Sequence, residues 1–282
     1  MKKCLFMMIG IAAMLGLASC SSDDDDNGNS GGNGKRYLAE ITVKEHPWKF
    51  GERSSYGEDY ENFKYDEKGN LIEKTTNYIN NTIGTRIYQR YKYTYDDRNR
   101  LIVMDQWGNS FAETKYKYNE FDSVSVKTTY NNEGRPITEY TYEYDRNKRL
   151  SKEIEHILYL GPDNGYIYEY SYSGNTVTMV TTDLKFGTLE STTVYEYDSH
   201  HNLLKSSTTS AVTGKTTVYD DNSYEYNTKG QLTRWASKNW VLKNDISYRN
   251  YYYNEDGTTE RIHLSYSFKE DQSDLIYTYT WK

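Results

Sequence analysis

Five histidines are the side chains of this sequence best suited to metal binding or proton transfer, and they are His46, His156, His200, His201 and His263. The pair His200-His201 falls in a predicted turn, where a metal site would need further ligands brought close in space. We favour the alternative, a solvated turn. His156 and His263 fall within predicted strands, where a hydrogen-bonded or exposed imidazole is the ordinary outcome. The histidine pattern therefore predicts no metal site.

No catalytic motif accompanies the histidines. The sequence contains no HExxH, no GxSxG, no phosphate-binding loop and no Cys/His pairing. Its acidic residues are numerous enough to include a glycosidase-like carboxylate pair, but most of them fall in predicted turns and on predicted outward faces. We therefore expect a protein that is not an enzyme, with no catalytic residue and no cofactor. A polysaccharide-acting hydrolase is the alternative.

Tryptophans are the candidate ligand-binding groups. Trp48, Trp107, Trp235 and Trp240 offer large aromatic surfaces, and rings rimmed by Asn, Asp and Lys suit the stacking of sugar CH groups. Packing in a core or an interface is the competing role for each of them. We expect residues 46–51 to form a loop and choose this loop for contact with an external ligand.

The scaffold that must position these residues is a repeat. Nine times, two aromatic residues flank a single residue, and the first members of successive pairs lie 23 to 30 residues apart. A period in the twenties marks one supersecondary unit copied along the chain. The pairs are Phe63/Tyr65, Tyr93/Tyr95, Tyr116/Tyr118, Tyr142/Tyr144, Tyr170/Tyr172, Tyr195/Tyr197, Tyr224/Tyr226, Tyr251/Tyr253 and Tyr277/Tyr279.

Each pair predicts a strand that ends in a tight turn. Tyr140, Tyr142 and Tyr144 alternate with polar residues, which is typical of a half-buried strand. An Asp or Asn follows most pairs, and a later Gly or Asn can supply the positive φ that a hairpin turn needs. In the third unit Phe121 stands where the turn glycine is expected, and the fifth unit shortens its turn to residues 173–175.

The repeat predicts an all-β fold. Two strands per unit give about 17–18 consecutive antiparallel strands, more than an open twisted sheet usually holds. We predict one up-and-down curved sheet or a closed barrel standing in water, with a tyrosine-rich interior. Charged residues opposite the tyrosines, such as Lys92 and Glu143, and a mean hydropathy of −0.95 argue against a lipid-facing outer band.

The amino-terminal residues predict export. Lys2 and Lys3 precede an apolar run from Leu5 to Leu17. A positive start followed by an apolar run too short to span a bilayer is typical of a bacterial signal peptide. We assign residues 1–19 to this signal.

Lipid attachment is predicted from the residues that follow. Leu17-Ala18-Ser19-Cys20 resembles a lipobox, which implies acylation of Cys20, and an ordinary secretory signal is the alternative. Residues 20–36 are rich in Asp, Asn and Gly and predict a flexible tether ahead of a single β-repeat domain over residues 37–282. The residues after Cys20 resemble the acidic surface-export signal of Bacteroidetes lipoproteins, with a solvated spacer as the alternative, and they are Ser21, Ser22, Asp23, Asp24, Asp25 and Asp26.

Two wider resemblances follow from the repeat. Tyr142-Glu143-Tyr144-Asp145, with Leu150 after the turn, resembles the YD repeats of RHS and wall-associated proteins. The whole chain, with its lipobox, resembles a family of Bacteroidetes lipoproteins of unknown function with a porin-like β fold. These resemblances imply an architecture and an outer-membrane location facing the extracellular medium, and they are silent about activity. Asp122-Ser123-Val124 also resembles the O-glycosylation acceptor of the same bacterial group.

Charge and cysteine content narrow the partners. A formal net charge of −7 argues against nucleic acid as a partner. Cys4 and Cys20 are the two cysteines, so residues 37–282 form no disulfide. We predict a non-enzymatic, lipid-anchored surface protein that binds a glycan or an envelope partner, with the membrane reached through its anchor. A purely structural envelope lipoprotein is the second alternative.

Overall fold

The computed structural model describes residues 38–49, 52–53, 59–80, 85–108, 112–239, 245–267 and 272–281. All of them belong to one compact unit, Arg36–Lys282. The unit is all-β, and within the described ranges the single helical element is the 3-10 turn η1 (Leu158–Leu160). No helix in this part of the chain is long and apolar enough to cross a bilayer. Cys20, the acidic run after it and Trp240 lie outside the described residues.

Successive strands pair antiparallel in chain order from β3 to β19. The first half of the sheet contains β1 (Leu38–Lys49), β2 (Glu52–Arg53), β3 (Asp59–Tyr65), β4 (Leu71–Asn80), β5 (Thr85–Tyr95), β6 (Leu101–Trp107), β7 (Ala112–Tyr118), β8 (Val124–Tyr130) and β9 (Pro136–Tyr144). The second half contains β10 (Leu150–His156), β11 (Gly165–Ser173), β12 (Thr176–Asp183), β13 (Leu189–Tyr197), β14 (Leu203–Ser210), β15 (Thr216–Tyr226), β16 (Leu232–Asn239), β17 (Asp245–Tyr253), β18 (Thr259–Tyr266) and β19 (Gln272–Trp281).

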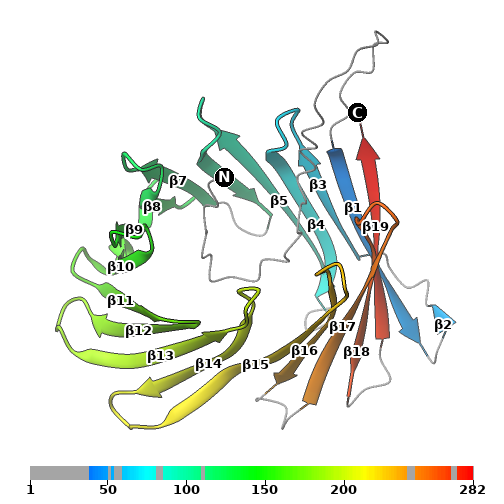
Figure 1. Cartoon of the computed structure of the whole chain (residues 1–282). Helices are drawn as coiled ribbons and strands as arrows, with labels where there is room; N and C mark the ends of the chain where they lie inside the picture. The colour runs from blue at the N-terminus through cyan, green and yellow to red at the C-terminus, as the bar shows by residue number, and fades with distance from the viewer. Residues whose placement is uncertain are drawn as a thin grey trace, which may run out of the picture. The chain divides into compact units, whose positions relative to one another are not determined.

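Strand β1 closes the sheet into a barrel. One side of β1 pairs with β19 along its length, and the other side pairs with β3 from Glu40 to Glu45. Figure 1 shows β1, in blue, beside β19, in red. Of the two forms that the repeat allows, the closed barrel is therefore the observed one. Its sheet has 19 strands, of which β2 contributes only 2 residues.

The expected loop at residues 46–51 is wrong over its first four residues. His46 to Lys49 continue β1, where His46 pairs with Asp274 and Trp48 with Gln272. The ladder from β1 to β3 ends at Glu45, so a proline at position 47 interrupts no pairing on that side. Pairing with β19 therefore overrides the local signal of Pro47, which favours a loop.

The hairpin turns repeat one hydrogen-bond pattern. Asp66 Oδ1 accepts the backbone N–H groups of Lys68 at 2.9 Å and Asn70 at 2.8 Å, and Gly69 has a φ of 82°. These Asx bonds hold the backbone and satisfy its donors without a helix or strand partner. The same pair of bonds forms at Asp96, Asn119, Asn131, Asp145, Asp198 and Asn227.

The barrel has two different rims. We call one the turn rim, because it carries the short turns 66–70, 96–100, 119–123, 145–149, 174–175, 198–202, 227–231 and 254–258. We call the opposite one the loop rim, and its described connections include residues 157–164, 184–188 and 211–215. Strand β1 begins at the turn rim, since Glu40 pairs with Lys64 one residue before the end of β3.

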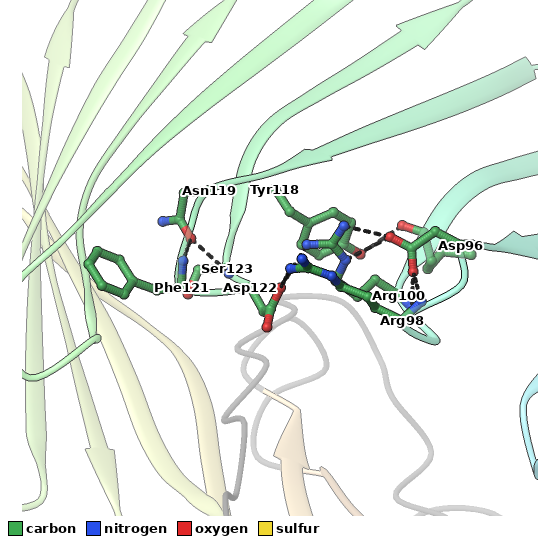
Figure 2. Close-up of polar contacts among 9 residues, drawn as sticks. Asp96, Arg98, Arg100, Tyr118, Asn119, Phe121, Asp122 and Ser123 are labelled. Atoms are coloured by element: carbon green, nitrogen blue, oxygen red, sulfur yellow. Dashed lines mark hydrogen bonds and ion pairs between the residues drawn. The ribbon is translucent and has the colours of Figure 1, made fainter.

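In the third unit, the predicted position of the turn glycine is off by one residue. Asp122, with a φ of 58°, occupies it, and Phe121 precedes it. Asp122 accepts Arg98 Nη1 at 3.4 Å and Arg100 Nη1 at 2.7 Å from the neighbouring turn. Figure 2 shows both arginines directed toward Asp122 and the ring of Phe121 directed away from them. These ion pairs help to hold an aspartate in a backbone conformation that favours glycine.

A bulge places the second tyrosine of most units. The register shifts by one residue where Tyr95 pairs with Leu101 and where Tyr118 pairs with Val124. The same shift recurs beside the other five-residue turns of the turn rim. A bulge bends the strand and re-aims its side chains. Six second tyrosines donate a hydrogen bond of 2.7–2.8 Å to the first carbonyl of the preceding unit's return strand, and they are Tyr95, Tyr118, Tyr144, Tyr172, Tyr253 and Tyr279.

The tyrosines face the interior, as predicted. Burial raises the pKa of Tyr95 and Tyr118 to about 12, and it raises the pKa of Tyr93, which Tyr91, Tyr95 and Tyr116 raise further. Tyrosines on alternate strands can influence one another in this way when they converge on a concave face. Charged residues on the opposite face are exposed to solvent, among them Lys92, Glu143, Glu169, Glu196 and Glu225.

Candidate functional site

Strand register brings two carboxyl groups into the tyrosine-lined interior. Strand β10 lies between β9 and β11, and Glu153 pairs with Tyr142 on one side and Tyr168 on the other. Glu155 pairs with Tyr140 and Tyr166 in the next row. Because directly paired residues point to the same face of a sheet, both glutamates face inward with the tyrosines. We call Tyr140, Tyr142, Glu153, Glu155 and Tyr168 the tyrosine–glutamate site.

The Glu155 carboxylate is held by two tyrosines. It accepts the hydroxyl of Tyr140 at 2.6 Å and the hydroxyl of Tyr168 at 2.8 Å, one on each oxygen. Burial raises the pKa of both tyrosines, and the hydrogen bond to Glu155 raises it further. Both phenols therefore stay protonated and act as donors, and the two oxygens of Glu155 accept from them.

Glu153 has a different environment. Burial raises the pKa of its carboxyl group, the nearby Lys127 lowers it, and Glu155 raises it. Within the described part of the chain, Glu153 has no hydrogen bond and no ion pair, although Tyr142 and Tyr168 lie on either side of it. A half-buried carboxyl group with no protein partner among the described residues leaves its acceptor atoms open to the barrel interior. Glu153 is therefore the group of this wall that remains able to bind a ligand.

Aromatic rings flank the two glutamates. The rings of Tyr140 and Tyr142 are stacked with centroids 6.4 Å apart and planes 16° apart, and those of Tyr166 and Tyr168 are 6.2 Å apart. Lys127 places its Nζ 4.8 Å from the centroid of Tyr140. The site thus combines apolar ring surfaces with two carboxyl groups, one of which accepts two tyrosine hydroxyls, and it lies beside the ammonium group of Lys127. Neutral polyhydroxylated ligands suit this combination, because their CH groups stack on rings and their hydroxyls bond to carboxyl groups.

Metal binding has no support in the described residues. No group of three or more His, Cys, Asp or Glu side chains there could hold a metal ion. His200 and His201 lie in the turn rim, as predicted, and the His200 ring stacks on Tyr226 with centroids 4.0 Å apart. His156 binds the carbonyl of Pro162 through Nδ1 at 3.0 Å, and His263 Nδ1 lies 2.9 Å from buried Asp274.

Trp235 faces the interior but is enclosed by its neighbours. Tyr224 stacks with it at a centroid distance of 6.2 Å, and the Arg249 guanidinium lies 4.3 Å from its centroid. Its indole N–H donates to Asn222 Oδ1 at 3.1 Å. With a flanking side chain from each adjacent strand and its donor satisfied, Trp235 packs the barrel wall. The competing role that the sequence left open fits this tryptophan better than ligand binding.

The predicted tryptophans are described in part. Trp107 is 36% exposed and lies on the outer face, with Lys92 Nζ 5.6 Å from its ring. The backbone of Trp48 lies in β1, and Trp240 is outside the described residues. Trp107 and Trp235, the two of the four whose side chains are described, lie on opposite faces of the sheet.

Glu153 and Glu155 were missed because the sequence analysis placed most acids in turns or on outward faces. Their signal is present in Leu150 to His156, where they alternate with Ile154. Which face of β10 points inward depends on the bulge next to Tyr144, and the bulge is not visible in the alternation itself.

Comparisons with known proteins give distant structural matches. No protein-family model matches the chain, and no curated protein sequence matches it. A porin-like protein from Bacteroides uniformis ATCC 8492 is 11% identical, with a TM-score of 0.44, and the match covers 86% of this chain and 96% of that one. A porin-like protein from Bacteroides vulgatus ATCC 8482 is 12% identical, with a TM-score of 0.34, covering 86% and 99%.

A third match is to part of a much larger protein. The TcdB2–TccC3 structure without its hypervariable C-terminal region is 14% identical, with a TM-score of 0.36, and the match covers 76% of this chain and 12% of that chain. Membership in the lipoprotein family stays a prediction, and function must be argued from the chain's own residues.

Proposed function

We propose that this chain is a non-enzymatic, lipid-anchored cell-surface protein that binds a saccharide in its barrel interior through the tyrosine–glutamate site. The observation that carries the proposal is Glu153, a half-buried carboxyl group with no hydrogen bond or ion pair to any described residue, beside Glu155, whose two oxygens each accept a tyrosine hydroxyl. A saccharide hydroxyl supplies the missing hydrogen bond, and the neighbouring rings supply stacking surfaces.

The arrangement supports binding better than hydrolysis. A glycosidase needs two carboxyl groups free to reach the reacting atoms, whereas both oxygens of Glu155 already accept tyrosine hydroxyls. The test is release of reducing sugar from any polysaccharide that binds. Turnover that is lost in Glu153→Gln would revive the hydrolase.

Binding is tested with a glycan panel and one matched pair of variants. Glu153→Gln removes the inward carboxylate, and Glu143→Gln makes the same change on the exposed outer face of β9. Loss of a hydrogen bond to a charged group costs about 1.5–3 kcal/mol, so Glu153→Gln should weaken binding by roughly 10- to 100-fold. Glu143→Gln should leave affinity unchanged. Equal affinities for the two variants, or no glycan bound at all, would contradict the proposal.

The anchor and its orientation are tested separately. Cys20→Ala in the full chain should move the protein from the membrane fraction to a soluble fraction, because acyl chains contribute roughly 0.8 kcal/mol for each buried methylene. Protease treatment of intact cells should degrade the wild-type protein if it faces the medium. Membrane attachment that survives Cys20→Ala would rule out lipidation at this position.

A further inference from the structure

The loop rim carries a row of exposed apolar side chains. Three connections contribute to it, the ones that follow β10, β12 and β14. An apolar side chain in water at the tip of a loop gains nothing from folding and often marks a contact surface. The residues and their exposed fractions are Tyr159 69%, Leu160 59%, Phe186 72%, Leu189 51% and Val212 83%.

Backbone hydrogen bonds fix these loops to the sheet. Leu184 N donates to the carbonyl of Gly165 at 3.0 Å, and Ala211 N donates to the carbonyl of Glu190 at 2.9 Å. Each bond ties one loop to the strand beside it. Successive loops are two strands apart, so each is offset by about 10 Å and the row extends about 20 Å along the rim.

The turn rim lacks such a row. Among its described turns, Phe121 is the one large apolar side chain in an exposed position, at 59%. Its Asx residues and arginines bond to one another, as at Asp122 and Arg100. Among the described connections, exposed large apolar side chains are therefore concentrated on the loop rim, and Phe121 offers an internal comparison for Phe186.

Charges beside the row are nearly balanced. Lys185 places its Nζ 5.5 Å from the ring of Phe186, and Lys215 stands next to the loop that carries Val212. Asp163, Asp183 and Glu190 offset these two cations. The net charge beside the row is therefore small, and burial of the apolar side chains must supply the attraction between the loop rim and its partner.

We propose that the loop rim docks on a lipid bilayer and inserts these tips into the headgroup layer. The tips stand on separate loops with polar residues between them, such as Asn164 and Thr213, and a fluid headgroup layer can fill such gaps. Side chains of this kind partition into the interface by burying apolar area.

The proposal relies on the proposed lipid anchor to keep a bilayer close. The predicted tether, residues 20–36, joins the barrel at the turn rim, where β1 begins. Extended, its 17 residues reach at most about 60 Å. The longest strand, β1, has 12 residues, so the wall is no higher than about 40 Å. The tether is thus long enough to pass the wall and let the opposite rim meet the membrane.

The test uses residues 36–282 without lipid, a compact unit that contains every strand of the closed sheet. The probes are vesicles of phosphatidylcholine alone and of phosphatidylcholine with phosphatidylglycerol in equal parts, read by co-sedimentation. Binding to both should be similar and should persist at high salt, since apolar burial drives it. Phe186→Ser should weaken binding about tenfold, and the triple variant with Leu160→Ser and Val212→Ser should abolish it.

Phe121→Ser is the matched control and should bind vesicles like the wild type. Phe186→Trp should show a blue-shifted tryptophan emission on vesicles, which does not depend on the folding of the serine variants. Equal losses for Phe121→Ser and Phe186→Ser, binding that salt abolishes, or no binding with self-association in solution would each overturn the proposal. Residues 36–282 lack Cys20 and its acyl chains. Failure of this test therefore does not bear on lipidation at Cys20 or on saccharide binding in the barrel interior.

Discussion

Tyr118→Phe tests how the repeat units are joined. The hydroxyl of Tyr118 donates to the carbonyl of Leu101, in the preceding unit, at 2.7 Å. The Arg100 guanidinium lies 4.7 Å from the centroid of the same ring. Phenylalanine keeps the ring, the bulge and the stacked arginine, and it removes only the hydrogen bond between units.

The expected cost is about 1 kcal/mol, the net value of one buried hydrogen bond, with a range of roughly 0.5–1.5 kcal/mol. For a domain of this size that corresponds to a fall in Tm of about 2–4 °C. The assay is urea unfolding of residues 36–282 followed by circular dichroism. The midpoint should fall with an unchanged m value, because the surface exposed on unfolding stays the same.

Tyr116→Phe is the matched control on the same strand. Its hydroxyl has no hydrogen bond within the described residues, while burial raises its pKa. Removing that hydroxyl should change stability by less than about 0.5 kcal/mol. If Tyr116→Phe and Tyr118→Phe lower the midpoint equally, the bond between units contributes nothing of its own and the reasoning is refuted.

Three further perturbations have defined outcomes. Burial raises the pKa of Tyr118 to about 12 in the folded state, against about 10 when unfolded, so its stabilising contribution is fully present below pH 10 and is lost as the pH rises toward 12. The difference in unfolding free energy between the wild type and Tyr118→Phe should therefore shrink over that window, and a difference that stays constant up to pH 12 would contradict this. His201→Gly should stabilise the protein by about 1 kcal/mol in urea unfolding, because His201 has a φ of 65° that glycine adopts more easily. Gly69 has a φ of 82°, and a Cβ added there would meet open space, so Gly69→Ala should destabilise the protein by a similar amount through the backbone alone. Gly165→Ala should lower the free energy of unfolding by more than about 3 kcal/mol, because the added Cβ would lie 1.8 Å from the carbonyl oxygen of Glu155. A loss no larger than that of Gly69→Ala would show that β10 can move away from the added methyl group.

The sequence predicts the repeating unit well because its determinants are local. Alternating tyrosines such as Tyr140, Tyr142 and Tyr144 specify a strand with one buried face, and an Asx residue five positions before the return strand specifies the turn. Both signals act within a few residues, so the structure of each unit can be predicted from the sequence of that unit. The number of strands and the inward tyrosines follow from repetition alone.

Closure could not be predicted in the same way. The pairing of β1 with β19 joins residues more than 200 positions apart. No local pattern in Leu38 to Lys49 indicates which strand pairs with β1. The same pairing keeps His46 to Lys49 in a strand where Pro47 suggests a loop. Long-range pairing between β1 and β19 therefore closes the barrel, and it also explains why the loop prediction at residues 46–51 is wrong over its first four residues.

The candidate site was missed for a related reason. Glu153 and Glu155 are ordinary strand residues until the register with Tyr142 and Tyr168 is known. A one-residue change at a bulge exchanges the inward and outward faces of a strand. Sequence reasoning directed attention to tryptophans, and the inward-facing one among the described side chains, Trp235, is flanked by Tyr224 and Arg249.

Hydroxyl-radical footprinting with the bound saccharide tests the central claim most directly. Mass spectrometry would compare the oxidation of each tyrosine with and without the ligand. The account predicts protection of Tyr142 and Tyr168 beside Glu153, with no change at Tyr219, which is 64% exposed and distant in sequence from the site. Protection confined to Tyr219 or to outer-face residues, with Tyr142 and Tyr168 unchanged, would contradict binding in the barrel interior.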